Sequence, residues 1–206
     1  MSPRKAAALP DGGNLRDHLI ATAERVIAER GTVGLTVRAI AREAAVADGV
    51  LYNHFADKEE LLAHALSAHV RKAEQGLGSL PEPGTGTVED NLKAYAVYGF
   101  ALHRAILPAL TGFVAQPKVL ARFAERRETG EEWRDRLGGY LRAERDLGRL
   151  PSDARTDAAA RVIVGACHET VISALFDERI PAQPAPEAVD ELVAVVMRGI
   201  AGTAAG

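Results

Sequence analysis

The chain has 206 residues, of which 47% are hydrophobic and 26% charged, and its formal net charge is −3. This composition is ordinary for a globular protein of one or two small domains and excludes a wholly disordered chain. The single cysteine, Cys167, excludes an internal disulfide and a cysteine zinc site, and it favours a reducing compartment.

The sequence contains no run of about 18 apolar residues and no apolar signal-peptide core. We therefore expect a cytoplasmic protein with no membrane partner. Residues 1–13 are expected to form a flexible arm, because prolines and glycines interrupt any helix there. Apolar residues at helical spacing then predict a helix over 15–30, and Gly31 follows it as a stop signal.

Two short helices are expected next. The first covers residues 37–44, with Thr36 as its N-cap. The second covers residues 48–55, with Asp48 placed to cap it. Such a short helix is unstable alone, so packing through Leu51, Tyr52 and Phe55 must hold it.

A longer helix is expected to open at Asp57, which with Glu60 has the spacing of a capping box, and to end near Gly76. The loop-forming residues 78–86 mark a boundary. Pro108 is expected to end the helix that precedes it. The remaining helices are expected over 88–107, just before Pro117, and over 118–147, 156–176 and 187–200, with a proline-rich segment at 180–186. No segment alternates with the period of a strand, so the chain is predicted to be all-α.

Residues 36–55 are the most informative segment. Two short amphipathic helices joined by residues 45–47 make a helix-turn-helix candidate, although an ordinary corner between two helices has the same pattern. The face opposite the packed one carries short side chains, which would let the helix backbone approach a groove wall closely. These residues are Asp48, Gly49, Val50 and Asn53.

Three stretches carry a resemblance to a known family: GLTVRAIA at 34–41, VADGVLYNHF at 46–55 and DKEELL at 57–62. In these residues the chain resembles the TetR (tetracycline-repressor-like) transcriptional regulators, over about residues 15–68. Two positions depart from the family. Ala45 stands where the family often has glycine, and would cost about 1 kcal/mol if its φ is positive. Gly49 weakens helix propensity at the start of the recognition helix.

The resemblance implies an all-α fold of about nine helices. Residues 14–69 would form a three-helix DNA-binding domain with its helix-turn-helix motif at about 36–55. Residues 70–206 would form a helical domain for ligand sensing and dimerisation.

The resemblance also implies roles for single residues. Phosphate contacts would come from Thr36, Tyr52, His54 and Lys58. Base readout would come from Arg38, Asp48, Gly49, Val50 and Asn53. Arginine can hold guanine and asparagine adenine, while valine can meet a thymine methyl group. Asp48 has two open roles, accepting from cytosine or capping the helix. Each residue also has a plain structural alternative: Tyr52 as core, His54 and Lys58 as solvated surface. Arg4 and Lys5 in the arm are either groove contacts or a disordered tail.

The second domain offers two further sets of candidates, and plain protomer core is the alternative for both. Ligand-pocket candidates are Tyr95, Tyr98, Phe100, His103, Phe113, Phe123, Trp133, Leu137 and His168. Dimer-interface candidates form apolar stripes and are Val162, Ile163, Ala166, Thr170, Val171, Ala174, Val189, Leu192, Val193, Val196 and Ile200.

The expected function is a bacterial DNA-binding regulator, by default a repressor that a small-molecule effector releases from a palindromic operator. The expected partners are double-stranded DNA, a second copy of the chain and that effector, with no cofactor and no metal. An enzyme on a helical scaffold, or a helix-turn-helix module for protein contacts, is the alternative. A phosphate loop, a nucleophile elbow and an HExxH motif are all missing from the sequence, which speaks against the enzyme.

The charge is unevenly distributed. Residues 1–56 carry 7 basic and 6 acidic side chains, a net charge of +1, and the remaining residues carry 18 and 22, a net charge of −4. A general positive field is therefore missing. Attraction to phosphate must come from a few placed groups and helix N-termini.

Overall fold

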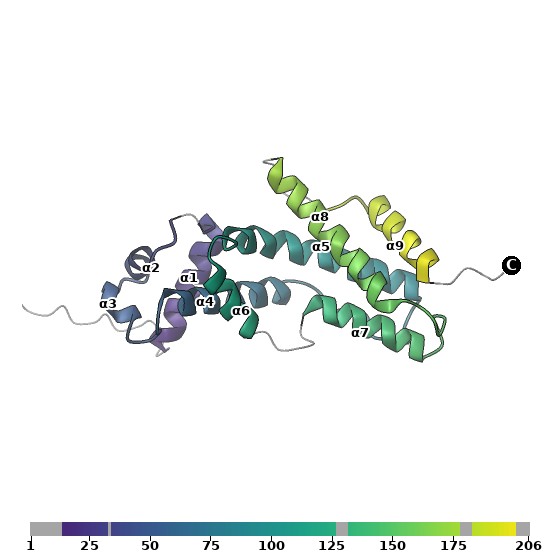
Figure 1. The fold of residues 1–206 in the computed structure, drawn as a ribbon, viewed down its shortest axis with the longest axis horizontal. Coiled ribbons are helices and arrows are strands. Elements are labelled where there is room, and N and C mark those ends of the chain that lie inside the picture. The colour runs from purple at the N-terminus through teal and green to yellow at the C-terminus, as the bar shows by residue number, and fades with distance from the viewer. Residues whose placement is uncertain (1–13, 33, 127–131, 178–182, 201–206) are drawn as a thin grey trace, which may run out of the picture. The chain divides into compact units, whose positions relative to one another are not determined.

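The computed structural model of the chain describes residues 14–32, 34–126, 132–177 and 183–200 (Figure 1). Within these ranges the backbone forms nine α-helices and no strand, which confirms the all-α prediction. The helices are α1 Leu15–Arg30, α2 Val37–Glu43, α3 Asp48–Leu51, α4 Lys58–Gln75, α5 Val88–Gly112, α6 Pro117–Glu125, α7 Trp133–Asp146, α8 Thr156–Phe176 and α9 Pro186–Ile200. The expected arm at 1–13, with Arg4 and Lys5, lies outside the described residues, as does part of the proline-rich segment.

The chain folds as two compact units. The first comprises residues 1–73 and 108–126, and the second comprises residues 74–107 and 127–206. The segment 108–126, which holds the end of α5 and all of α6, thus belongs with the N-terminal helices.

One hydrophobic core holds the first unit together. It joins fully buried side chains of α1, α2 and α4, among them Leu19, Ile40 and Leu62, to residues of the segment 108–126. Phe113 and Phe123 belong to this core. The expectation that these two rings line a ligand pocket with the aromatic residues of the second unit is therefore wrong.

The second unit is built from α5, α7, α8 and α9, and α8 packs against both α7 and α9 (Figure 1). Its core contains a tight aromatic cluster. The rings of Tyr95 on α5 and Tyr140 on α7 lie with their centroids 4.8 Å apart. Leu92 on α5, Leu137 on α7 and Ile163 on α8 are completely buried.

The structure corrects three helix boundaries. Helix α5 does not end before Pro108 but continues to Gly112. A proline inside a helix costs about 3 kcal/mol, and burial of Leu102 and Ala109 on either side opposes that cost.

No helix ends just before Pro117. Instead Pro117 is the first residue of α6, a position where its missing N–H costs nothing. The single helix expected over 118–147 is two helices, α6 and α7, and the residues between them include 127–131, outside the described ranges.

Helix α8 is long and apolar enough to cross a membrane, with a mean hydropathy of 1.4 over 18 residues. Length and composition are weak evidence, because a helix in the core of a globular protein passes the same test. In this structure α8 also carries Arg161, His168 and Glu169, and it packs on two neighbouring helices.

Candidate nucleic-acid interface

Helix α2 and the turn after it have the geometry that a helix-turn-helix requires. The Oγ1 atom of Thr36 accepts a hydrogen bond from the Ala39 N–H at 3.1 Å, so Thr36 is the N-cap of α2, as the sequence predicts. After the helix, the Val46 N–H donates to the Ala41 carbonyl at 2.9 Å and the Ala45 N–H to the Arg42 carbonyl at 3.2 Å. This pair of bonds is a Schellman motif, which places residue 45 in the left-handed region.

Ala45 has a φ of 57°. The condition attached to the prediction from the sequence is therefore met, because an alanine occupies a left-handed position where glycine is favoured. We expect Ala45→Gly to raise the free energy of unfolding by about 1 kcal/mol, since glycine adopts this φ without a Cβ clash. Urea denaturation measures the change. Ala39→Gly, inside α2, is the control, and we expect it to destabilise by roughly 0.5–1 kcal/mol. Equal destabilisation by both substitutions would contradict the strain at residue 45.

Helix α3 is shorter than predicted. It has four residues, Asp48–Leu51, where the sequence pattern extends the helix to residue 55. Its remaining turn is closed by the bonds from His54 N–H and Phe55 N–H to the Leu51 carbonyl, at 3.1 and 3.0 Å. Leu51 and Phe55 are buried and anchor the segment, as predicted. Tyr52 does not share that role, because it is 59% exposed.

Asp48 does not cap α3. The N-cap position is occupied by Ala47, which offers no side-chain bond. The Asp48 carboxylate instead accepts a hydrogen bond from the Arg38 Nε at 3.1 Å, an ion pair that joins α3 to α2. Both side chains are exposed, so the pair contributes less than about 1 kcal/mol and can open without a large cost.

The sequence-predicted residues of both sets lie outside the core of this motif. Thr36, Arg38, Asp48, Gly49, Tyr52 and Asn53 are exposed, and Val50, His54 and Lys58 are half-buried. None of the nine is in the core. They combine a phenol, an arginine, an asparagine and an exposed capping hydroxyl over the short helix α3 and its flanks.

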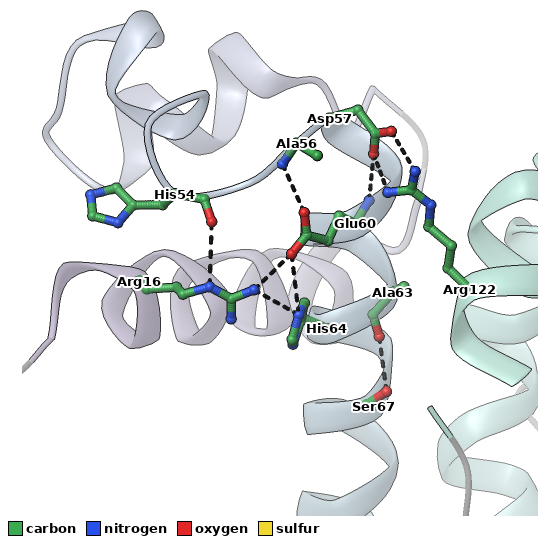
Figure 2. Close-up of polar contacts among 9 residues, drawn as sticks. All are labelled: Arg16, His54, Ala56, Asp57, Glu60, Ala63, His64, Ser67 and Arg122. Atoms are coloured by element: carbon green, nitrogen blue, oxygen red, sulfur yellow. Dashed lines mark hydrogen bonds and ion pairs between the residues drawn. The ribbon is translucent and has the colours of Figure 1, made fainter. Parts of the chain in front are cut away.

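The end of the motif is fixed by a polar network that the sequence analysis did not identify (Figure 2). Arg16 on α1 lies over the ring of Phe55, 4.6 Å from its centroid, and donates to the carbonyl of His54 at 3.3 Å. The same guanidinium pairs with Glu60 of α4 at 2.8 Å, and Glu60 in turn accepts from the Ala56 N–H at 2.7 Å. Both ends of the 54–56 segment are therefore tied to neighbouring helices.

His64 completes this network. Its Nε2 lies 2.8 Å from the Arg16 guanidinium, so a neutral ring accepts the bond (Figure 2). Burial, followed by the positive charges of Arg126 and Arg16, lowers the pKa of the His64 imidazole. The Ala56 N–H and then Arg16 lower the pKa of the Glu60 carboxyl group. The network thus favours the charged form of Glu60 and the neutral form of His64.

The start of α4 shows half of the predicted capping box. The Asp57 Oδ1 accepts from the Glu60 N–H at 2.9 Å, but Glu60 reaches back to Ala56 instead of to Asp57. Asp57 is also held by Arg122 of α6, which donates to both carboxylate oxygens at 2.5 and 2.6 Å (Figure 2). This bidentate pair fixes the helix terminus at which Lys58 stands.

In the second unit, most of the remaining pocket candidates are buried in a packed cluster: Tyr95, Tyr98, Phe100, His103, Trp133 and Leu137. The Nδ1–H of His103 donates to the Gly99 carbonyl at 2.6 Å, and the His103 ring meets Trp133 edge to face. Burial lowers the pKa of His103 to about 4, so it is neutral at pH 7. His168 alone among these candidates is exposed, at the edge of an open cleft.

The dimer candidates also divide into two groups. Those buried within the protomer are Ile163, Val171, Ala174, Val189, Val193, Val196 and Ile200. Val162 is exposed, and Ala166, Thr170 and Leu192 are half-buried. Exposed apolar side chains that the sequence analysis did not select, Phe176 and Val195, lie on the same two helices.

Comparison with known proteins places the helix-turn-helix residues in context. Residues 19–65 match the model described as "Bacterial regulatory proteins, tetR family". The chain is 31% identical over 99 residues to the HTH-type transcriptional repressor NemR of Escherichia coli K12, a match of 47% of this chain and 50% of NemR. It therefore spans about half the length of this curated relative.

Two further proteins are similar over most of the chain. The HTH-type transcriptional regulator EthR of Mycobacterium tuberculosis H37Rv is 25% identical over 203 residues, which cover 96% of this chain and 92% of EthR. The crystal structure of the transcriptional regulator FadR of Bacillus subtilis in complex with stearoyl-CoA has a TM-score of 0.56. That match covers 89% of this chain and 98% of FadR at 21% identity, which shows a shared fold.

Proposed function

Since the N-terminal part of this chain belongs to the tetR family of bacterial regulatory proteins, we propose that the protein is a sequence-specific DNA-binding transcriptional repressor released by a small-molecule effector. The observation that carries the proposal is the exposed surface of α2 and α3. There, short polar side chains and the exposed ring of Tyr52 lie on and around α3, while the buried Leu51 and Phe55 hold this segment against the core. The two similar curated proteins, NemR and EthR, are both named as transcriptional regulators.

The proposed roles follow the chemistry of each exposed side chain. Thr36, Tyr52, His54 and Lys58 contact phosphates and set the register of the motif. Thr36 and Lys58 each stand at a helix start, where unpaired N–H groups favour an anion. Arg38 and Asn53 read base edges, and Val50 contacts a thymine methyl group. Gly49 lets the backbone come close to the groove wall.

Asp48 gains a defined role in this proposal. Its ion pair with Arg38 holds the guanidinium beside the start of α3 in the free protein. On DNA, the carboxylate accepts from cytosine while Arg38 turns to guanine. Because the pair is exposed and weak, the exchange has a small free-energy cost.

A homodimer completes the proposal. Val162 and Phe176 on α8 and Val195 on α9 are 49%, 83% and 58% exposed, an unusual set for an isolated protomer surface. Pairing α8 and α9 with their copies across a two-fold axis would bury them. Two recognition helices would then meet successive major grooves of a palindromic operator, about 34–36 Å apart.

The second unit is the proposed sensing domain. A ligand that binds more tightly to a conformation with the wrong helix spacing lowers the affinity for DNA. We place the DNA-binding domain at residues 14–69 and the sensing and dimerising domain within 70–206, and this function involves no catalytic step. The similar FadR structure holds a small molecule, stearoyl-CoA.

The experiment compares two charge deletions on operator DNA and on random DNA. We expect Lys58→Ala to weaken binding to both and to reduce the salt slope by about 1, because it removes one phosphate contact. We expect Arg38→Ala to cost about 1–3 kcal/mol on the operator and to relax specificity, because it removes a base contact. Fluorescence anisotropy over a range of salt concentrations measures both effects.

Lys118→Ala is the matched control, since Lys118 is an exposed lysine on α6, outside the helix-turn-helix. It should leave affinity and salt slope nearly unchanged. Equal losses for Lys58→Ala and Arg38→Ala on the two DNAs would contradict the division into phosphate and base contacts.

A further inference from the structure

An open cleft runs between α7 and α8 in the second unit. Its volume is about 550 Å³, within the range of small-molecule sites. One wall follows Arg134, Gly138 and Arg142, which are spaced four residues apart on α7. The other wall includes Arg161 and His168 of α8. The two helices follow each other in the chain and run antiparallel, because Arg142 near the end of α7 pairs with Asp157 at the start of α8.

Three guanidinium groups line this cleft, and their partners differ. Arg142 is paired with Asp157 at 2.7 Å. Among the residues that the structure describes, Arg134 makes long ion-pair contacts, at 3.6 Å to Asp135 and 3.9 Å to Glu132. Arg161 has no ion pair with any residue that the structure describes. Asp135 and Asp157 are the acidic side chains of the lining, so its three arginines leave the cleft with one excess positive charge.

His168 of α8 also lines the cleft. Partial burial and then the charge of Arg134 lower the pKa of its imidazole, so the ring is neutral at pH 7 and offers a hydrogen bond. Its ring lies against His103, with centroids 4.5 Å apart, and His103 in turn meets Trp133. A ligand that contacts His168 would therefore touch a side chain that itself packs against the buried His103–Trp133 pair.

The floor of the cleft is made of small residues. Gly138 and Ala160 are buried there, and Gly165 lies nearby with open space beside its Cα. Small side chains on both helices leave room for a compact apolar body, with Val164 as the larger apolar contact. Arginine forks bind carboxylates and phosphates in a bidentate manner.

We propose that the cleft between α7 and α8 binds a small molecule with an oxyanion group on a compact apolar body, held by Arg134, Arg161 and His168. The assignment of this molecule as the effector rests on the proposed regulatory function. The cleft is distinct from the buried aromatic cluster in which the sequence analysis expects the ligand.

The test uses pairs of probes that differ in charge but not in shape: benzoate with benzamide, and hexanoate with hexanamide, with inorganic phosphate as the bare anion. Trp133 is the only tryptophan of the chain, so its emission in the full-length protein reports occupancy through His168 and His103. Isothermal titration calorimetry gives the affinities. We expect each carboxylate to bind at least tenfold more tightly than its amide.

Arg161→Gln and Arg134→Gln should each weaken carboxylate binding at least tenfold. Arg161 is exposed, so its replacement leaves the fold intact, which far-ultraviolet circular dichroism checks. Arg198→Gln, an exposed arginine on α9 outside the cleft, should change nothing. Absence of binding across the carboxylates and phosphate, equal binding of carboxylate and amide, or binding that both cleft variants leave unchanged would overturn the proposal.

A second measurement separates this inference from the proposed function. Saturating carboxylate should lower operator affinity in the wild type and not in Arg161→Gln. If the carboxylates bind and operator affinity does not change, the assignment as effector is wrong. Operator binding by the ligand-free protein tests the proposed function separately, because it depends neither on carboxylate binding nor on its effect on operator affinity.

Discussion

Glu144→Ala is expected to destabilise the protein by about 3–5 kcal/mol. Glu144 lies on α7 and its side chain is completely buried. Its Oε1 accepts from the N–H of Gly84 at 3.1 Å, and its Oε2 lies 3.3 Å from the Nε of Arg149. Removal of the carboxylate takes the only ion-pair partner that the described residues give to the half-buried Arg149 guanidinium, leaves the Gly84 N–H without its acceptor, and opens a cavity.

The loop 84–86 depends on this ion pair. Arg149 also donates to the carbonyls of Thr85 and Gly86. The Glu144 carboxylate therefore positions Arg149, and Arg149 in turn positions the loop. Glu144→Gln keeps an acceptor for Gly84 and loses only the charge, so we expect a smaller loss than with alanine. Urea denaturation followed by circular dichroism measures both.

Glu191→Ala, an exposed glutamate on α9, is the matched control and should stay within about 0.5 kcal/mol of the wild type. A loss below about 1 kcal/mol for Glu144→Ala would refute the view that the buried carboxylate organises this part of the second unit.

Gly99→Ala has the second largest expected effect. Gly99 lies on α5, and a Cβ built there would stand 2.2 Å from Cζ2 and 2.4 Å from Cη2 of Trp133. The indole is buried and its edge is held against His103, so it cannot yield without disturbing the cluster. We expect a net loss of about 2–3 kcal/mol, because overpacking outweighs the gain of up to about 1 kcal/mol in helix propensity.

The emission of Trp133 gives this prediction a direct readout, since a displaced ring becomes more exposed and its spectrum shifts to longer wavelength. Gly139→Ala on α7 is the control. Nothing lies within 4 Å of the Cβ it would add, so it should stabilise by roughly 0.5–1 kcal/mol. If both alanines stabilise the protein, the close approach of Trp133 to α5 is not a constraint.

The helix-turn-helix could be predicted from the sequence because its signals are local. Thr36 caps α2 as the pattern predicts, and Ala45 takes the left-handed conformation that the sequence analysis left as a condition. Local signals did not fix the length of α3. Its last turn is closed by bonds to Leu51, and its position depends on Arg16, which lies 38 residues away from its acceptor His54. No pattern in the sequence links those two residues.

The long-range contacts explain the other differences. Phe113 and Phe123 look like pocket residues in the sequence, but the segment 108–126 joins the core of the first unit. Pro117 is typical of a break, and only its place as the first residue of α6 shows that it begins a helix. The cleft between α7 and α8 depends on the pairing of two helices, so arginines spread over 134–161 gave no local signal.

Selection of binding sites from random DNA by the full-length protein tests the central claim most directly. The account predicts that an inverted repeat is enriched, with half-site centres about 34–36 Å apart. The double variant Tyr52→Ala, Lys58→Ala, which removes two phosphate contacts from the motif, should lose the enrichment while it keeps the wild-type circular dichroism spectrum. No enrichment by the wild type, or equal enrichment by the folded double variant, would contradict the assignment of this surface as the DNA-binding site.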